Sequence, residues 1–165
     1  MLASNDDLAR LVIAEATRLH MTIGTAESCT GGLVSAALTD VPGSSEVVRG
    51  GVVSYAAEVK QAVLGVQPIV CNTAGLGVVS EVCARQMAEG ACRALKCDVA
   101  VSTTGIAGPT GSEPGKPVGT VWFAVSSACG THASRRLLPG NRSGVRAHAV
   151  RVALQLMLEH LRFSN

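Results

Sequence analysis

Aromatic residues are scarce in this sequence, which has one Trp, one Tyr and two Phe among 165 residues. Hydrophobic residues still make up 47% of the chain, so a core has to consist of Val, Ala and Leu rather than rings. Aromatic platforms on which single-stranded nucleic acid stacks are therefore nearly absent. The formal net charge is only +2, and the basic residues are scattered except near the C-terminus. Binding to a phosphate backbone needs a stronger basic field, and we expect no nucleic-acid partner.

The sequence also lacks long apolar runs and paired cysteine motifs. It has no apolar N-terminal segment of the signal type and no apolar stretch of about 18 residues, so we expect a cytoplasmic protein without a membrane partner. The cysteines form no C-x-x-C pair, and a disulfide framework is not expected in a reducing compartment. The four histidines lack metal-ligand spacing. We expect no metal, no other cofactor and mostly buried thiols at Cys29, Cys71, Cys83, Cys92, Cys97 and Cys129.

The order of the expected elements predicts an α/β fold. The length is about that of one domain, and we expect a single domain over residues 1–165. Strands that alternate with helices, followed by a hairpin and a closing helix, are typical of a three-layer α/β/α sandwich with a mixed, mostly parallel sheet of about five strands. The expected helices begin near residues 5, 31, 80 and 141, the expected strands lie at 21–26, 51–55, 98–104, 118–126 and 131–138, and loops are expected over 65–79 and 105–117.

A pair of glycines interrupts a segment that would otherwise predict one continuous strand over residues 47–55. A continuous strand would hold Ser45 roughly 30 Å from its far end, at about 3.3 Å per residue. The helix that follows returns only about 1.5 Å per residue, so Ser45 and Lys60 could not meet. We therefore expect Ser45 to cap a helical turn over 46–49, a strand confined to 51–55, and a return of the chain that brings Lys60 toward Ser45.

The few reactive groups of the chain gather between residues 25 and 60. Ser28 and Ser45 lie in glycine-flanked turns, followed by Tyr55 and by Lys60, the only lysine before residue 96. A serine at a tight turn with a lysine nearby is typical of a serine/lysine site that cleaves amides. A lysine that loses its proton in a partly dry pocket can accept the proton of the serine.

Six segments in chain order carry a resemblance to a known family. They are TAESCTGG at 25–32, PGSS at 42–45, SYAAEVK at 54–60, TGIAGP at 104–109, KPVGTVWFA at 116–124 and GNR at 140–142. Together they resemble the CinA C-terminal domain family and span nearly the whole chain. The resemblance implies a stand-alone nicotinamide mononucleotide deamidase, which hydrolyses the carboxamide of that nucleotide to nicotinic acid mononucleotide and ammonia.

The resemblance also implies roles for individual residues. By motif position, Ser45 is the expected nucleophile and Lys60 its base. Amide hydrolysis further needs N–H donors for the oxyanion and a proton for the departing ammonia. The N–H groups near residues 31–32 or in the Ser45 turn, together with Lys60, are expected to supply them. The residues expected to bind the substrate are Ser28, Thr30, Gly31, Gly32, Tyr55, Thr104, Gly105 and Arg142.

Several alternatives stay open. The turn after Ser28 is either an anion-binding turn at a helix N-terminus or a plain helix cap. Cys29 in that turn is a rival nucleophile, disfavoured because no histidine lies within the matched motifs. Arg142 is assigned to the substrate phosphate, with Arg146 as its rival. The domain can also be a non-catalytic nucleotide-binding or interaction module. A homo-oligomer is expected for a chain so rich in Ala and Val.

Overall fold

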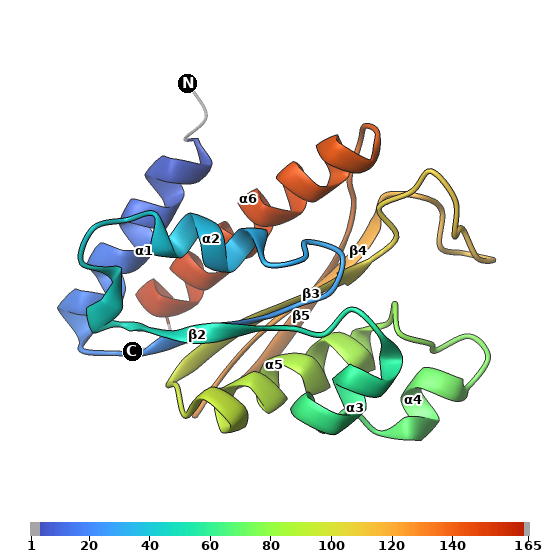
Figure 1. Ribbon diagram of the computed structural model, residues 1–165, viewed down its shortest axis with the longest axis horizontal. Coiled ribbons are helices and arrows are strands. Elements are labelled where there is room, and N and C mark those ends of the chain that lie inside the picture. Colours follow the sequence, from blue (N-terminus) through green and yellow to red (C-terminus); the bar gives the residue numbers. More distant parts are fainter. Residues whose placement is uncertain (1–3, 164–165) are drawn as a thin grey trace.

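The computed structural model describes residues 4–163 as a five-stranded mixed sheet between two layers of helices (Figure 1). The strand order is β2-β1-β3-β4-β5. β1 pairs in parallel with β2 and β3, whereas β4 pairs antiparallel with β3 and β5. The α/β class and the mixed five-stranded sheet are thereby confirmed. The strands are β1 (Ile23–Glu27), β2 (Val48–Val53), β3 (Val99–Gly105), β4 (Thr120–Ser127) and β5 (Gly130–Leu137).

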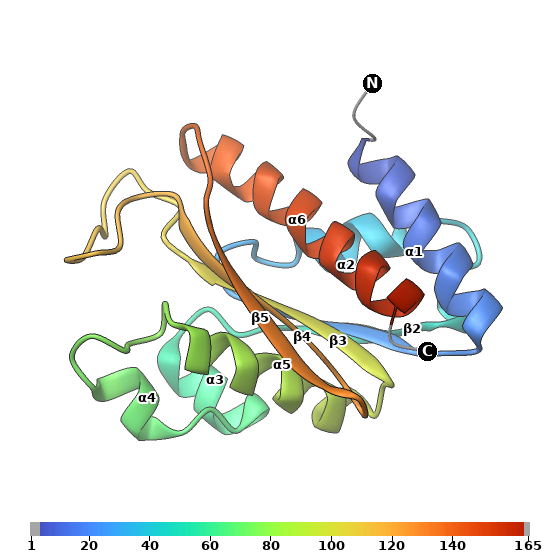
Figure 2. The same cartoon turned by 180° about the vertical axis from the view of Figure 1, so that it is seen from behind.

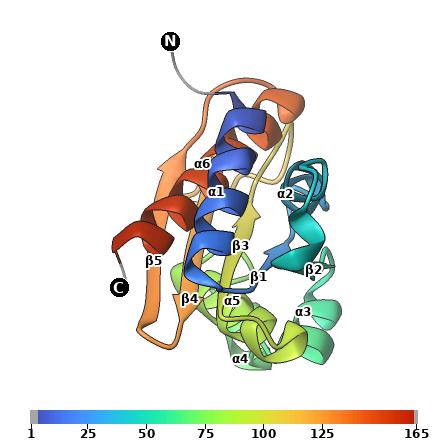
Figure 3. The ribbon, with the colours of Figure 1, turned by 90° about the vertical axis from the view of Figure 1, so that its left-hand side faces the viewer.

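The helices divide between the two faces of the sheet, as the end-on view shows (Figure 3). α1, α2 and α6 cover one face and α3, α4 and α5 the other (Figures 1 and 2). Each layer closes over its own core of mainly aliphatic side chains, so the low aromatic content is compensated by close packing of small residues. The helices are α1 (Asn5–Leu19), α2 (Leu33–Thr39), α3 (Ala57–Leu64), α4 (Pro68–Asn72), α5 (Glu81–Leu95) and α6 (Arg142–Phe163).

Polar caps start the long helices where the sequence predicts them. The Ser4 hydroxyl accepts a hydrogen bond from the N–H of Asp7 at 3.1 Å, and the Asp7 carboxylate accepts one from the N–H of Ser4 at 2.9 Å. Ser80 accepts from the N–H of Cys83 at the start of α5. Asn141 accepts from a first-turn N–H of α6. Each cap satisfies a backbone donor that has no partner within its helix.

The segment around β2 differs from the expectation. A short 3₁₀ helix covers Ser44–Glu46, and β2 already begins at Val48. The two glycines are accommodated within the strand rather than ending it. The register with β1 shifts by one residue beside Gly50, which has φ 143°, and a Cβ on Gly51 would lie 1.9 Å from the Ser35 hydroxyl of α2. The glycine pair therefore marks a bulge and a close helix-strand approach.

The segment 65–79, expected to be a loop, contains the five-residue helix α4. Pro68 stands at its first position, where the missing N–H costs nothing because that donor has no helical partner. The glycines at 75 and 77 follow the helix in a turn. The short element was missed because proline and glycine within a few residues of each other favour loops.

The carboxyl ends of β1, β2 and β3 meet at one edge of the sheet. The Ser54 N–H donates to the Glu27 carbonyl and the Ser28 N–H to the Thr103 carbonyl, at 2.8 and 2.9 Å. β1 lies between β2 and β3, so the loops that leave β1 and β3 diverge at this edge. In an open α/β sheet such a point is where ligands bind.

Candidate active site

The turn after β1 is organised around the buried carboxylate of Glu27, which is 1% exposed. Its two oxygens accept hydrogen bonds from the hydroxyls of Thr25 and Thr30 and from the N–H groups of Gly32, Val34 and Ser35, at 2.6 to 3.1 Å. Glu27, the last residue of β1, thus acts as the N-terminal cap of α2. The N–H groups of Gly32, Val34 and Ser35 at the start of α2 are therefore already occupied, and this part of the turn is a helix cap.

Lys60 has a fully buried side chain, 0% exposed, although its helix lies at the surface. Its Nζ donates to the carbonyl oxygens of Ser54 and Tyr55 at 2.5 and 3.1 Å and contacts the Ser28 hydroxyl at 3.0 Å. No ion pair involves this lysine among residues 4–163. Because α3 begins shortly after β2 ends, the Lys60 side chain on α3 reaches back to the carboxyl end of β2.

Ser28 is therefore the hydroxyl that lies against the lysine. It follows β1 directly, and its side chain is 9% exposed. Its backbone is held from both sides, because its N–H donates to the Thr103 carbonyl and its carbonyl accepts from the N–H of Gly31. The hydroxyl is thus fixed against a buried amine at the edge of the sheet where a ligand would bind.

Lys60 contacts Ser28, Ser54 and Tyr55 rather than Ser45, the partner expected from the sequence. Ser45 lies in the 3₁₀ helix before β2, and Lys60 reaches the residues after β2. A six-residue strand spans roughly 20 Å at about 3.3 Å per residue. The two side chains therefore lie toward opposite ends of β2. Ser45 is exposed at the surface, in the 3₁₀ helix that precedes the amino end of β2.

Burial lowers the pKa of the Lys60 ammonium below its ordinary value of 10.5. Removal of the charged form from water is the main cause, and neighbouring thiols oppose it weakly. A smaller fraction of Lys60 is protonated at a given pH than for a surface lysine. This is the property that a lysine base requires.

Cys29 does not have the properties of a nucleophile. The side chain is 5% exposed, and burial, reinforced by the nearby Glu27 charge, raises the thiol pKa to about 11. The thiolate is the reactive form of cysteine, so at neutral pH almost none of this residue is reactive. The structure favours the serine beside Lys60 over the cysteine next to it.

Two arginines of α6 approach the site in different ways. Arg146 donates to the carbonyl oxygens of Cys29 and Thr30, both at 3.1 Å. It holds the serine turn in place and is not a free surface charge. Arg142 donates to the Gly108 carbonyl at 2.9 Å and to the Tyr55 hydroxyl at 3.1 Å. It lines a cavity of about 380 Å³ with residues from the loop after β3.

The remaining expected residues divide into those inside the turn and those beside it. Thr30 is buried and bonds to Glu27 and to Thr103, so it stabilises the turn. The Thr104 hydroxyl donates to the Val78 carbonyl at 2.6 Å. A Cβ on Gly105 would lie 2.7 Å from the Thr120 carbonyl oxygen, which explains this glycine by packing against β4. Tyr55 is 63% exposed and borders the site through its hydroxyl and its carbonyl.

Two residues of the site were missed from the sequence. Glu27 lies within the TAESCTGG segment and Thr103 within the strand expected over 98–104, but neither was assigned a role in the site. A carboxylate four positions before a Gly-Gly helix start was the available signal for Glu27, because a buried carboxylate needs several donors and a helix start has unpaired N–H groups. Thr103 becomes part of the site only through the parallel pairing of β1 with β3.

Two kinds of feature are absent from residues 4–163. Nowhere in this part of the chain do three or more His, Cys, Asp or Glu side chains gather as a metal site would require. None of its helices combines the length and the apolar character of a membrane span.

The sequence and fold have clear relatives. Residues 5–161 match the family model described as the CinA C-terminal domain. CinA-like proteins of Gemmatimonas aurantiaca and Mycobacterium marinum are each 48% identical to the chain, over 91% and 92% of its length. The matched region covers 35% and 34% of those relatives, so the chain spans about a third of the curated relatives that it matches.

Solved structures match the chain over nearly its whole length. The competence damage-inducible protein A of Klebsiella pneumoniae is 34% identical with a TM-score of 0.94, and the match covers 99% of this chain and 100% of that one. The competence/damage inducible protein CihA of Agrobacterium tumefaciens is 40% identical with a TM-score of 0.90, covering 98% and 99%.

Proposed function

Because the chain belongs to the CinA C-terminal domain family, we propose that it hydrolyses the carboxamide of nicotinamide mononucleotide with Ser28 as nucleophile and Lys60 as base. The products are nicotinic acid mononucleotide and ammonia. The substrate is the one that the resemblance to deamidases implies, whereas the geometry around Lys60 supports the choice of the two catalytic residues.

The contacts of the Lys60 nitrogen carry this proposal. Two of its three partners are the carbonyl oxygens of Ser54 and Tyr55, which can only accept hydrogen bonds. A neutral amine has two N–H bonds and one lone pair. With both N–H bonds held by the carbonyls, the lone pair faces the third partner, the Ser28 hydroxyl. Neutral Lys60 is thus oriented to accept the proton of that hydroxyl.

The reaction then follows from these positions. As Ser28 Oγ attacks the carboxamide carbon, its proton passes to Lys60, and the carbonyl oxygen becomes an oxyanion. The Lys60 ammonium gives the proton to the departing nitrogen, and ammonia leaves. The resulting ester on Ser28 is cleaved by a water molecule, which neutral Lys60 deprotonates in the same way.

The oxyanion needs N–H donors, and the start of α2 cannot provide them because Glu27 occupies it. No hydrogen bond to another described residue uses the N–H groups of Cys29 and Thr30. These donors follow the nucleophile directly in a turn held by Arg146. We assign the oxyanion to them, because donors that are fixed before the reaction stabilise the charge without reorganisation.

The test measures ammonia release from nicotinamide mononucleotide by Ser28→Ala, Lys60→Arg and the control Ser45→Ala. Arginine keeps the positive charge but does not deprotonate. Ser28→Ala and Lys60→Arg should each lower kcat by at least about a thousandfold, with no further loss in the double variant. Ser45→Ala should retain activity. Normal turnover in Ser28→Ala, or loss in Ser45→Ala alone with an unchanged melting curve, would overturn the assignment.

A further inference from the structure

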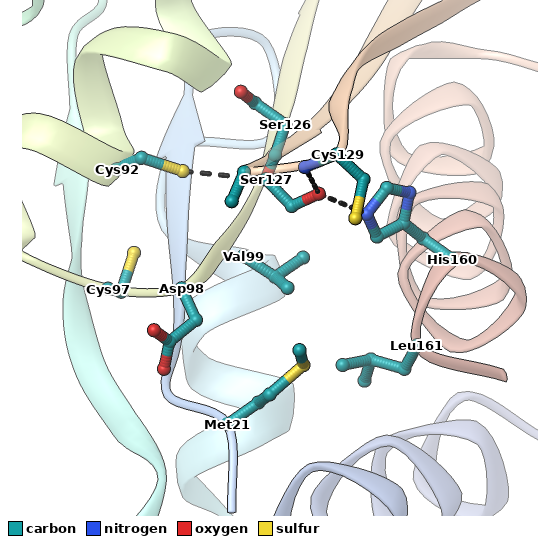
Figure 4. Close-up of a pocket in the computed structure, with 11 residues that line it drawn as sticks. Met21, Cys92, Cys97, Asp98, Val99, Ser126, Ser127, Cys129, His160 and Leu161 are labelled. Atoms are coloured by element: carbon teal, nitrogen blue, oxygen red, sulfur yellow. Dashed lines mark hydrogen bonds between the residues drawn. The ribbon is translucent and has the colours of Figure 1, made fainter. Parts of the chain in front are cut away.

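A second pocket lies at the other end of the sheet from Ser28 and Lys60. It has a volume of about 360 Å³ and is formed where α5 ends, β3 begins, and the β4-β5 turn meets α6 (Figure 4). Three of the six cysteines of the chain line it, namely Cys92, Cys97 and Cys129. Cys92 and Cys97 form no disulfide bond in this structure. None of the groups in this pocket takes part in the proposed hydrolysis.

The end of α5 brings Cys92 and Cys97 together. Lys96 adopts the left-handed conformation with φ 50° and ψ 49°, and its N–H donates to the Cys92 carbonyl. The Cys97 N–H donates to the same carbonyl at 3.2 Å. A helix that ends with this pattern brings into contact the side chain four positions before the left-handed residue and the side chain directly after it. That contact is ordinarily hydrophobic, and here both partners are thiols.

The two thiols have different chemical environments. The Cys97 thiol donates to the Ala91 carbonyl, with 4.0 Å between sulfur and oxygen, and the interaction between the two thiols lowers the pKa of Cys92 and raises that of Cys97. Cys92 is half-buried and lies 3.4 Å from the Ser126 carbonyl (Figure 4). Cys97 is 8% exposed. Cys92 is therefore the more reactive thiol, and Cys97 is the buried thiol beside it.

The Cys97 sulfur packs closely against Gly24 of β1. A Cβ on Gly24 would lie 3.0 Å from the Cys97 sulfur and 2.6 Å from the Leu95 side chain. Both thiols also face the pocket, so a small reagent can reach Cys92 while Cys97 stays within reach of it. A disulfide needs only that the two side chains rotate toward each other, because their backbone is already closed by the shared carbonyl.

We propose that Cys92 and Cys97 are a dithiol modification site at which a low-molecular-weight disulfide produces a reversible intrachain disulfide. The Cys92 thiolate attacks one sulfur of the reagent, a mixed disulfide forms, and the first reagent thiol leaves. Cys97 then gives up its proton and attacks the Cys92 sulfur, which releases the second reagent thiol. The pair loses two electrons and two protons, and the reagent gains both.

The experiment treats the folded, full-length chain with oxidised glutathione, blocks the remaining thiols and digests the protein with trypsin. Arg93 and Lys96 lie between the two cysteines, so trypsin separates them and a disulfide appears as a linked pair of peptides. Two of the six thiols should be lost, with the peptide ending at Arg93 linked to the peptide beginning at Cys97. Dithiothreitol should restore both thiols and both separate peptides.

The matched variants identify the partners. The peptide that begins at Cys97 also contains Cys129, so Cys129→Ser must retain the linked pair. Cys97→Ser should instead leave Cys92 as a mixed disulfide with glutathione, and Cys92→Ser should abolish modification of Cys97. Loss of the link in Cys129→Ser, or modification spread over other cysteines with Cys92 and Cys97 unlinked, would overturn the proposal. Peptide masses report the disulfide whether or not the protein is a deamidase. This experiment therefore tests the dithiol proposal independently of the proposed function.

Discussion

At the scale of single residues, the central feature is a lysine buried without a carboxylate partner. Lys60 satisfies its donors with two backbone carbonyls and one hydroxyl. A charge in this position is disfavoured by the loss of water, and the amine is correspondingly easier to deprotonate. The burial that disfavours the charged form of Lys60 therefore also favours the neutral amine, which is the form that can act as a base.

The first residue-scale prediction is a pH profile. Because only neutral Lys60 can accept the serine proton, kcat/KM for nicotinamide mononucleotide should rise with pH, by about tenfold per unit below the pKa of Lys60. The midpoint should lie below 10.5. A kcat/KM that is independent of pH through the neutral and alkaline range, with a folded protein throughout, would remove Lys60 from the role of base.

The second prediction distinguishes two arginines. Arg142 carries a guanidinium beside a cavity, whereas Arg146 is engaged with two carbonyls of the serine turn. Loss of a charge-assisted contact to the substrate phosphate, about 1.5 to 3 kcal/mol, should lower kcat/KM of Arg142→Ala roughly ten- to a hundredfold on the nucleotide and spare the riboside. Arg146→Ala should lower kcat/KM for the nucleotide and for the riboside alike, because it loosens the turn that holds Ser28. Equal losses on the two substrates in Arg142→Ala would mean that this residue does not bind the phosphate.

At the scale of elements, close approach between α3 and α5 depends on one glycine. A Cβ on Gly90 of α5 would lie 2.0 Å from the Leu64 carbonyl oxygen at the end of α3. Since α3 carries Lys60, the packing of these helices also determines where the lysine lies. A glycine inside a helix is ordinarily unfavourable, and here the contact outweighs that cost.

Replacement of helical glycines by alanine tests this contact. Gly90→Ala should lower stability by about 1 to 3 kcal/mol, because backbone atoms must move apart. Gly144→Ala in the first turn of α6 is the matched control. The nearest atoms there lie 3.6 Å from the added Cβ, and alanine should stabilise by up to about 1 kcal/mol. The measurement is thermal unfolding at one pH, and a Gly90→Ala melting temperature at or above that of the wild type would contradict the packing interpretation.

At the scale of the whole molecule, the buried lysine couples proton binding to folding. The folded-state pKa of Lys60 is lowered below 10.5, so between the two pKa values the unfolded chain binds more protons than the folded one. The free energy of unfolding therefore rises with pH through this window and falls as pH drops toward the folded-state pKa.

This coupling gives a measurable difference between the wild type and Lys60→Met. The variant loses the hydrogen bonds at every pH, which shifts its stability by a constant amount. Only the wild type carries the proton linkage of this site. The stability of the wild type minus that of the variant should thus increase with pH below 10.5. Urea unfolding of both proteins at several pH values measures it, and a difference that falls as pH rises would show that burial does not lower this pKa.

The sequence by itself determined the class of fold and the family. Alternating apolar strands and capped helices predicted the layered α/β arrangement, because periodicity and caps are local properties. Six ordered motifs indicated the CinA C-terminal domain, and the lone Lys60 among them was singled out before its contacts were known. Such features require no knowledge of how distant segments pair.

Only the tertiary structure decided which serine meets the lysine. Ser28 and Lys60 are 32 residues apart, and they meet because β1 and β2 are parallel neighbours with their carboxyl ends at one edge. Ser45 is closer in sequence, but β2 runs through the glycine pair and holds it at the other end. Whether a glycine pair ends a strand or forms a bulge depends on the helix that packs against it. Here α2 packs its Ser35 side chain against Gly51, and a contact between two separate elements is not visible in the local sequence.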